Sequence, residues 1–423
     1  MKKNMNSLQL KLTEEVKVMN KKVRIFSFIC AVLIAGMCFS GCGKNAEPSS
    51  SAENETTASE TKAVSSQENN TSQTESMTED KTEPAKTSLE NNLKPSEGLE
   101  FESNGDGSCT IIGIGTCEDN DIVIPLKSPN GDTVTLIGEY AFMSLEDVDS
   151  VTLENYSYEV DKRAFQYGEF KKVNIVGGNP IIKESAFSSC EDLTAITFKD
   201  CKLQINEYAF LSSGKDAEVS FTNCTGLIDK RAFQYGDFAS LTISKSELEI
   251  DNSAFSSCEE LTSVTFSDST VTAGEYAFLS CGDSAVVEIK NCSITLDDRA
   301  FQYASLSSLS ISGSKAEIGD SAFSSCEDLE KVNIDCTSVT LGEYAFMSCK
   351  DLTNVSICDN SASDNEIEID DRAFQYCEKL ESVKIGKGNV KIGEYAFSSC
   401  ADKLSVSAAG KSYTAKELEK GLK

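Results

Sequence analysis

The sequence contains no histidine and no tryptophan among its 423 residues. Without histidine, the chain cannot build a Ser-His-Asp or Cys-His catalytic site or a metal site with a histidine ligand. It also has no P-loop, no G-x-S-x-G nucleophile motif and no C-x2-C pair of the kind that zinc sites use. We therefore expect no enzymatic activity, no catalytic residue, no cofactor and no metal site.

Positive charge is scarce. The chain has 39 Lys and Arg against 68 Asp and Glu, a net charge of −29. Residues 99–423 hold 27 of the basic and 55 of the acidic residues, so the acidity belongs to this part of the chain. Such a surface repels polyanions, and we expect no nucleic-acid partner.

Long apolar runs are missing too. The apolar stretch at 25–39 is shorter than the roughly twenty residues that a membrane-spanning helix needs. It follows a basic segment and ends in small residues before Cys42, an order that resembles a bacterial lipoprotein signal. We predict a signal peptide at 1–42, starting at Met1 or at Met19, with lipidation of Cys42. An uncleaved membrane anchor is the alternative.

Residues 43–98 contain no aromatic residue and no cysteine, and consist mainly of Ser, Thr, Glu, Asn and Lys. A segment of this composition buries too little apolar surface to offset the entropy of ordering. We predict a disordered tether with a root-mean-square reach of about 40 Å.

The rest of the chain repeats one unit. An aliphatic residue stands five positions before an Ala-Phe pair, with Ala273 as the exception, and an alternating apolar pair such as Ile196 and Phe198 follows. That alternation predicts a short, half-buried strand. The units are 22 or 23 residues apart, with one interval of 28, and their phenylalanines are Phe142, Phe165, Phe187, Phe210, Phe233, Phe255, Phe278, Phe301, Phe323, Phe346, Phe374 and Phe397.

No unit can bury these side chains alone, so we expect stacked rungs with one buried column of phenylalanines. The Ala-Phe segment is long enough for one or two helical turns, and four aspartates stand where an N-cap would be: Asp161, Asp229, Asp297 and Asp370. We predict an α/β solenoid of about twelve rungs, with a parallel sheet on one face and short helical turns on the other. It would span 133–410, between a β cap at 99–132 and a cap at 411–423 that contains a short helix.

The unit I-x-x-x-A-F-x-x-C-x-x-L-x-x-V-x-I resembles the BspA-like leucine-rich repeat of bacterial surface proteins, and "GEYAFMSCKDLTNVSI" fits it nearly whole. The resemblance covers about residues 133–410. It implies a leucine-rich-repeat solenoid, a surface lipoprotein, and adhesion or partner binding without a particular ligand.

The residue two positions before each phenylalanine follows the order Tyr, Arg, Ser three times and then Tyr, Arg, Tyr. Tandem copying of a three-rung block is a sufficient explanation. Two further possibilities stay open: a solvent-facing binding stripe, since Tyr and Arg are enriched at interface hot spots, or stacking of Arg on a neighbouring Tyr. The stripe would comprise Tyr140, Arg163, Tyr208, Arg231, Tyr276, Arg299, Tyr344, Arg372 and Tyr395, with Tyr167, Tyr235, Tyr303 and Tyr376 adding to it.

Seventeen cysteines in an exported protein would ordinarily suggest disulfides. Seven of them, however, share a position three residues after the phenylalanine that holds Leu145, Gly168, Ser213, Gly236 or Ala304 in the other rungs. Such a position is a small packing slot, so we expect free thiols in the repeats. Cys109 and Cys117 are the best candidates for a disulfide.

Taken together, these features predict a monomeric, lipid-anchored recognition or adhesion protein on the cell surface. It would bind a protein or glycan partner and contact the membrane through the lipid on Cys42. The alternative is a passive spacer of the cell envelope, whose acidic pairs at 297–298 and 370–371 bind divalent cations weakly.

Overall fold

The computed structural model describes residues 93–359 and 364–422, and all of them belong to one compact unit at 88–423. The predicted signal peptide, Cys42 and almost all of the tether lie outside the described residues, as does part of the 28-residue rung. None of the described residues forms a helix long and apolar enough to cross a membrane.

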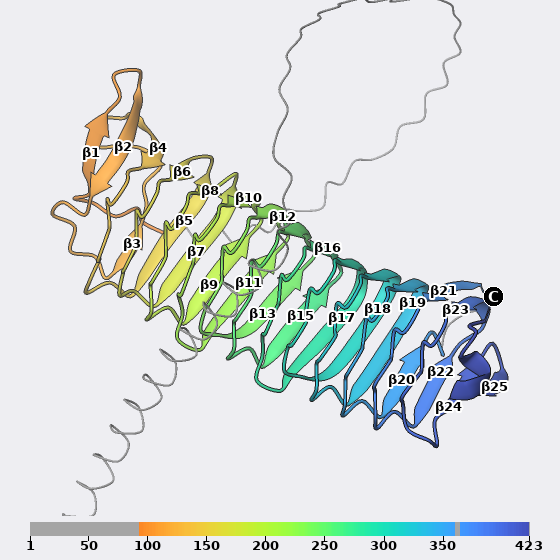
Figure 1. The fold of residues 1–423 in the computed structure, drawn as a ribbon. Helices are drawn as coiled ribbons and strands as arrows, with labels where there is room; N and C mark the ends of the chain where they lie inside the picture. Colours follow the sequence, from red (N-terminus) through yellow and green to blue (C-terminus); the bar gives the residue numbers. More distant parts are fainter. Residues whose placement is uncertain (1–92, 360–363, 423) are drawn as a thin grey trace, which may run out of the picture. The chain divides into compact units, whose positions relative to one another are not determined.

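The described chain winds into a stack of about thirteen turns, the rungs (Figure 1). Each rung contributes to two columns of parallel strands. The first column contains β3 (Asp121–Val123), β5 (Ser150–Tyr156), β7 (Lys172–Gly178), β9 (Ala195–Lys199), β11 (Ala217–Thr222), β13 (Phe238–Ser244), β15 (Ser263–Ser267), β20 (Asn354–Ile357), β22 (Ser382–Ile385) and β24 (Ser405–Ala408). The second contains β2 (Ser108–Gly113), β4 (Thr133–Ile137), β6 (Glu159–Val160), β8 (Ile181–Ile182), β10 (Lys202–Ile205), β12 (Thr225–Ile228), β14 (Glu247–Ile250), β16 (Thr270–Ala273), β21 (Asn365–Ile369) and β23 (Gly388–Ile392).

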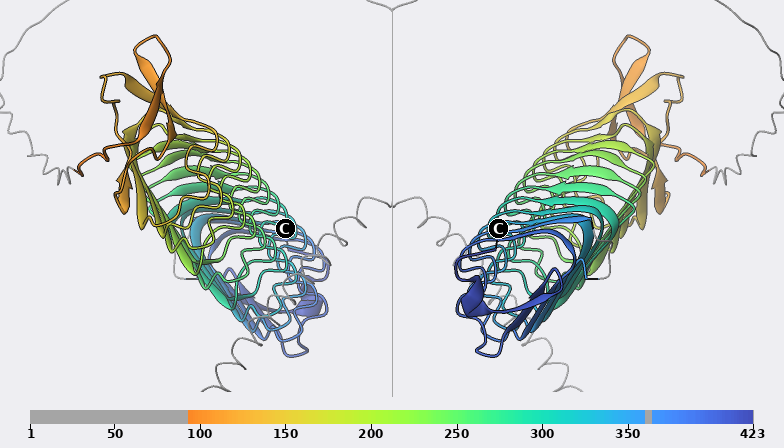
Figure 2. Two further views of the ribbon diagram at one scale, coloured as in Figure 1. Left: turned by 90° about the vertical axis from the view of Figure 1, so that its left-hand side faces the viewer. Right: turned by 90° about the vertical axis from the view of Figure 1, so that its right-hand side faces the viewer.

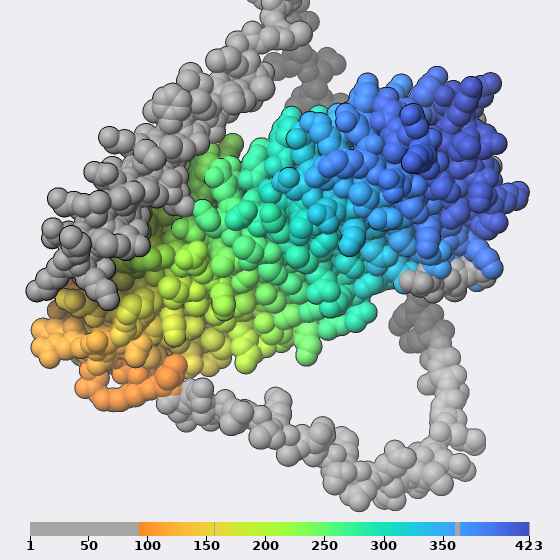
Figure 3. All heavy atoms as spheres, turned by 90° about the horizontal axis from the view of Figure 1, so that it is seen from below, coloured from red at the N-terminus to blue at the C-terminus, as the bar shows by residue number. Residues whose placement is uncertain are grey.

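Three long strands join the two columns: β17 (Ala285–Leu296), β18 (Leu306–Ile318) and β19 (Lys331–Leu341). Their first halves pair within the first column and their second halves within the second. Equivalent positions of successive rungs lie opposite each other, as Val264 does to Val287. Because parallel strands lie about 4.8 Å apart, every side chain of the repeat stacks on its counterpart in the next rung. The rungs are seen as successive, regularly displaced windings in the two views of Figure 2, and as successive coloured bands on the surface in Figure 3.

The predicted helical turns are wrong. The Ala-Phe segment that closes each rung is a run of tight turns, and this segment is called the turn face here, from two residues before to two residues after each phenylalanine. The phenylalanine N–H donates to the alanine C=O of the next rung at 2.7–2.8 Å in all eleven steps, from Phe142 to Phe374. The N–H two residues later also bonds to the next rung. These groups are the donors that a helix would have used internally.

Left-handed backbone explains why no helix forms. In each of the twelve rungs that carry an Ala-Phe pair, the residues two before and two after the phenylalanine have φ between 51° and 63°. A right-handed helix cannot pass through such residues, whereas a tight turn with a positive φ at its third residue can. Three of the expected N-cap aspartates, Asp161, Asp229 and Asp370, cap these turns instead. Asp161 and Asp229, for example, accept a hydrogen bond from the N–H of the following residue at 2.8 Å and 2.7 Å.

The predicted phenylalanine column is confirmed. Successive rings, from Phe142 to Phe397, stack with centroids 4.5–5.4 Å apart and planes within 10° of parallel. The alternating apolar pairs of the first column, such as Ile196 and Phe198, are buried as expected. The aliphatic residue five positions before each phenylalanine is buried as well, because it ends a second-column strand.

All cysteines in the part of the chain that the structure describes are free thiols, including Cys109 and Cys117, so the disulfide suggested for that pair is absent. The Cys109 thiol is buried and lies 3.7 Å from the carbonyl of Asp132. The seven cysteines of the packing slot share one contact. Each thiol donates to the phenylalanine carbonyl of the preceding rung at 2.8–3.3 Å: Cys190, Cys258, Cys281, Cys326, Cys349, Cys377 and Cys400.

The two ends of the stack differ from its middle. At the N-terminal end, β1 (Glu100–Ser103) pairs antiparallel with β2. At the C-terminal end, β25 (Lys411–Thr414) pairs antiparallel with β24, and a single 3-10 turn follows at Ala415–Leu418. Thr414 and Glu417 form a capping box on this turn, and Leu418 is buried in the core.

Candidate recognition face

The nine residues of the predicted stripe all lie on the turn face, at the first left-handed position of their rungs. Their Cα positions therefore follow one line along the stack, with Ser185, Ser253 and Ser321 completing it. This line brings a Tyr and an Arg side by side in five places, since each of the four Arg rungs directly follows a Tyr rung and the Arg372 rung also precedes that of Tyr395. Whether these residues bind a partner stays a prediction.

The arginines contact the preceding rung. The Arg163 Nη1 donates to the Tyr140 hydroxyl at 3.0 Å, and this hydrogen bond raises the pKa of the guanidinium. Arg231 does the same to Tyr208 at 3.2 Å. Three arginines also lie over tyrosine rings, 5.8–6.0 Å from the centroids: Arg231 over Tyr208, Arg299 over Tyr276, and Arg372 over both Tyr344 and Tyr395. The alternative that Arg stacks on a neighbouring Tyr is thus confirmed for these pairs.

A glutamate completes each contact, and the sequence analysis missed it. Glu207, Glu275 and Glu343 accept from the next rung's arginine at 3.2, 2.8 and 2.9 Å, and Glu139 lies 3.9 Å from Arg163. The signal was present, because a Glu precedes the Tyr in each of these four rungs. The resulting Glu-Tyr-Arg clusters are called clamps here. They tie neighbouring rungs together and neutralise the four arginines.

A second line of tyrosines lies on the other side of the phenylalanine column. Tyr167, Tyr303 and Tyr376 are 52%, 60% and 48% exposed, more than most large apolar side chains of the protein. Within the described residues, their hydroxyls make no hydrogen bond and their rings stack on no arginine. Serine occupies this second left-handed position in the eight rungs without a tyrosine. Tyr140 and Tyr395 of the first line are 46% and 43% exposed, so both lines present tyrosine rings to solvent.

The left-handed positions of the turn face do not hold the residue types that adopt a positive φ most readily. Gly, Asn and Asp adopt positive φ at the lowest cost, and other residues pay roughly 1–2 kcal/mol each. None of these three residue types occupies any left-handed position flanking the phenylalanines, which hold only Tyr, Arg and Ser. The inter-rung hydrogen bonds offset the backbone cost, and the exposed side chains are not explained by backbone preference.

The residues that lead into the turn face, two to five positions before each phenylalanine, are unevenly charged along the stack. In the rungs of Phe142–Phe233, acidic and basic residues are equal in number at these positions. From the rung of Phe278 onward, acids dominate, with Glu275, Asp297, Asp298, Asp320, Glu343, Asp370, Asp371 and Glu394 against Arg299 and Arg372. Burial, followed by the charge of Asp298, raises the pKa of Asp297. Within the described residues, no group of three or more Cys, Asp or Glu is arranged to hold a metal ion.

Comparison with known proteins places these observations in a family. A family model described as "BspA type Leucine rich repeat region" matches residues 117–237, 226–353 and 340–413. A leucine-rich repeat protein from Bacteroides ovatus is 19% identical, with 72% of this chain and 91% of that one covered and a TM-score of 0.29. A leucine-rich cell surface protein from Faecalibacterium prausnitzii is 18% identical over 78% and 98%, with a TM-score of 0.26. No curated protein matches the sequence.

Proposed function

The chain belongs to the BspA-type leucine-rich repeat family, and we propose that it is a surface recognition protein that binds a protein or glycan partner through its turn face. The observation that carries this proposal is the line of exposed tyrosines, Tyr167, Tyr303 and Tyr376, on a rigid backbone. Tyrosine supplies a large contact area at a low cost in side-chain entropy and is enriched among interface hot spots.

The regular rung spacing supports the same proposal. Tyr167 and Tyr303 are six rungs apart, about 29 Å along the stack, and Tyr303 and Tyr376 are three rungs apart, about 14 Å, so a partner meets these tyrosines at multiples of one three-rung interval. The clamps restrict motion of the neighbouring side chains, which reduces the entropy that binding has to offset. The described residues offer no motif for catalysis, and we expect the protein to act by binding alone.

The N-terminal segment completes the proposal. A lipid on Cys42 followed by a long polar tether would display the solenoid on an exported, membrane-anchored protein. Membership of a family of bacterial surface proteins is consistent with this placement. Radiolabelled palmitate incorporation in the producing cells, compared with that of a Cys42→Ser variant, tests the anchor.

The binding proposal is tested by presenting the purified protein to an array of host matrix proteins and glycans. A saturable partner is expected, and its binding should weaken when Tyr167, Tyr303 and Tyr376 are all changed to serine. Serine is the matched substitution because eight other rungs carry it at the same left-handed position. If the partner bound the triple serine variant with unchanged affinity, the proposal that it binds through the turn face would be contradicted.

A passive spacer that binds divalent cations is the second candidate. The observation that favours it is the run of acidic residues from Glu275 to Glu394, where burial, followed by the charge of Asp298, keeps the pKa of Asp297 above its usual value. A cation there would relieve the repulsion and stabilise the fold. The melting temperature should then rise with millimolar calcium, and fail to rise in an Asp297→Asn, Asp298→Asn variant.

A further inference from the structure

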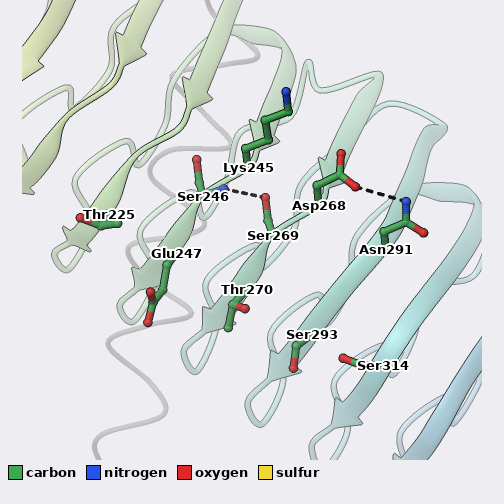
Figure 4. Close-up of a pocket in the computed structure, with 10 residues that line it drawn as sticks. All are labelled: Thr225, Lys245, Ser246, Glu247, Asp268, Ser269, Thr270, Asn291, Ser293 and Ser314. Atoms are coloured by element: carbon green, nitrogen blue, oxygen red, sulfur yellow. Dashed lines mark hydrogen bonds between the residues drawn. The ribbon is translucent and has the colours of Figure 1, made fainter. Parts of the chain in front are cut away.

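A polar groove runs along the corner between the two strand columns, away from the turn face. It has a volume of about 380 Å³ and extends from the rung of β12 to that of β18 (Figure 4). Ten side chains line it, and none is aromatic or aliphatic. We propose that this groove binds a linear, uncharged oligosaccharide.

One wall consists of three residues with left-handed backbone, each at the bend between the two strand columns of its rung, just before β14, β16 and the second half of β17. Lys245, Asp268 and Asn291 have φ of 51°, 51° and 55°, so their side chains leave the corner in the same direction. The Asn291 amide donates to Asp268 Oδ1 at 3.2 Å, as Figure 4 shows. This leaves the second carboxylate oxygen of Asp268 available as an acceptor. Within the described residues, the Lys245 ammonium forms no ion pair.

The other wall is formed by the first residues of the second-column strands. Thr225, Glu247, Thr270 and Ser293 are register partners from rung to rung. Their side chains therefore repeat about every 4.8 Å. The hydroxyls of Thr225, Thr270 and Ser293 make no hydrogen bond to the part of the protein that the structure describes. Hydroxyl groups of this kind can both donate to and accept from a ligand.

The floor of the groove is rigid. Ser246 and Ser269 are both 5% exposed. The Ser269 hydroxyl donates to the Ser267 carbonyl at 2.6 Å and accepts from the Ser246 N–H at 3.0 Å. The Ser246 hydroxyl bonds in the same pattern, to the Ser244 carbonyl at 2.8 Å. The walls are thus held at a fixed separation before any ligand arrives, which lowers the cost of binding.

A carbohydrate fits this chemistry better than a peptide does. The N–H groups of Lys245, Glu247, Asp268 and Thr270 already donate to neighbouring rungs, so the corner has no free edge on which to add a strand. The groove also has no apolar pocket for peptide side chains. It offers hydroxyls, an amide, two carboxylates and an ammonium, a set that complements the hydroxyls of a sugar. With two carboxylates against one ammonium, it disfavours an anionic polymer.

The spacing of the groove favours a linear chain. The rung repeat of about 4.8 Å is close to the length of one hexopyranose unit in an extended chain. Successive sugars would therefore meet successive rungs. Thr225 to Ser293 spans three rung intervals, which corresponds to about four sugar units.

The test is isothermal titration of the purified protein with β-1,4- and β-1,3-linked gluco-oligosaccharides, from disaccharide to hexasaccharide. We expect saturable binding that tightens up to about four units and then levels off. Asp268→Asn should weaken it about tenfold, because a charge-assisted acceptor is lost while the hydrogen bond from Asn291 is retained. Lys245→Asn, which places at the corner the residue found there in neighbouring rungs, should also weaken it.

Asp200→Asn is the matched control. Asp200 holds the same left-handed corner one rung beyond the groove and accepts from Asn223 at 2.6 Å, as Asp268 does from Asn291. Its change should leave binding intact. Failure of every oligosaccharide to bind at millimolar concentration, equal loss in Asp200→Asn and Asp268→Asn, or Asp268-dependent binding of calcium alone would each overturn the proposal. The triple tyrosine-to-serine variant should bind the oligosaccharide normally, so the groove and the turn face are tested separately.

Discussion

The Phe238 ring occupies the space that a side chain at Gly236 would need. A Cβ placed on Gly236 would lie 2.0 Å from Cε2 of Phe238, and Gly168 stands in the same relation to Phe170 at 2.2 Å. Elsewhere the same slot holds a cysteine, Leu145, Ala304 or Ser213, and the Ser213 hydroxyl donates to the Phe187 carbonyl at 2.7 Å. The space is therefore filled either by the side chain of the slot residue itself or, where that residue is glycine, by a phenylalanine two positions later.

This relationship predicts a rescue. Gly236→Ala should lower the free energy of unfolding by about 1–3 kcal/mol, because it overpacks the slot. Adding Phe238→Leu should recover most of the loss, since the chain itself combines Ala304 with Leu306 at these two positions. Urea unfolding of the single and double variants measures both effects. An alanine variant as stable as the parent would show that the slot has spare room.

The thiols of the slot should be chemically inert in the folded protein. Burial raises the pKa of both Cys190 and Cys326 to about 12, so almost no thiolate is present at pH 8. Cys117 and Cys400 are the partly exposed cysteines of the described residues, and burial raises the pKa of Cys400. Mass spectrometry after iodoacetamide treatment should therefore find modification mainly at Cys117, and at the buried cysteines once the protein is denatured. Rapid native labelling of Cys326 would contradict the burial of this column.

The clamps should contribute little to stability. Arg299→Ser removes a 2.8 Å ion pair with Glu275 and the contact with the Tyr276 ring. Both side chains of the ion pair are about 40% exposed, so solvent screening limits the loss to about 1 kcal/mol or less. Serine is the residue that other rungs carry at this position. A cooperative unfolding transition that moved by many degrees would assign the clamps a larger structural role.

The run of acidic residues from Glu275 to Glu394 should make stability depend on pH. Because folding raises the pKa of Asp297 above 3.8, the unfolded chain releases this proton more readily, and the ionised carboxylate destabilises the fold at neutral pH. Asp297→Asn should therefore raise the melting temperature at pH 7. The gain should shrink as pH falls through the folded-state pKa and disappear below 3.8. A neutral-pH melting temperature unchanged by the substitution would contradict this electrostatic account.

The sequence predicted those parts of the fold whose side chains carry an unambiguous pattern. The Ala-Phe repeat and the alternation at Ile196 and Phe198 identified the core and the first strand column. The second column was not predicted, although Leu203 and Ile205 alternate in the same way, because several of its strands, such as Ile181–Ile182, are too short to show an alternating pattern. The turn face was assigned wrongly because Tyr, Arg and Ser give no signal of positive φ, unlike Gly or Asn.

The candidate site was predictable only in part. The structure places all nine residues of the predicted Tyr and Arg stripe on the turn face, and their binding of a partner stays a prediction. The roles within it depended on distances between rungs. Only the structure shows that the Tyr140 hydroxyl accepts a hydrogen bond from Arg163, whereas the Tyr303 ring is 60% exposed and stacks on no arginine of the described residues. The polar groove carries no motif at all, because its lining comes from equivalent positions of several rungs.

The most direct test of the turn face as a recognition surface is the dissociation constant of one partner for two variants. The first changes Tyr167, Tyr303 and Tyr376 to serine, and the second changes Arg163, Arg231 and Arg299 to serine as an equally extensive alteration of the clamps. We predict a loss of about a hundredfold or more for the tyrosine variant, as expected for the removal of hot-spot rings, and a much smaller loss for the arginine variant. Unchanged affinity of the tyrosine variant, with its melting temperature intact, would contradict the account.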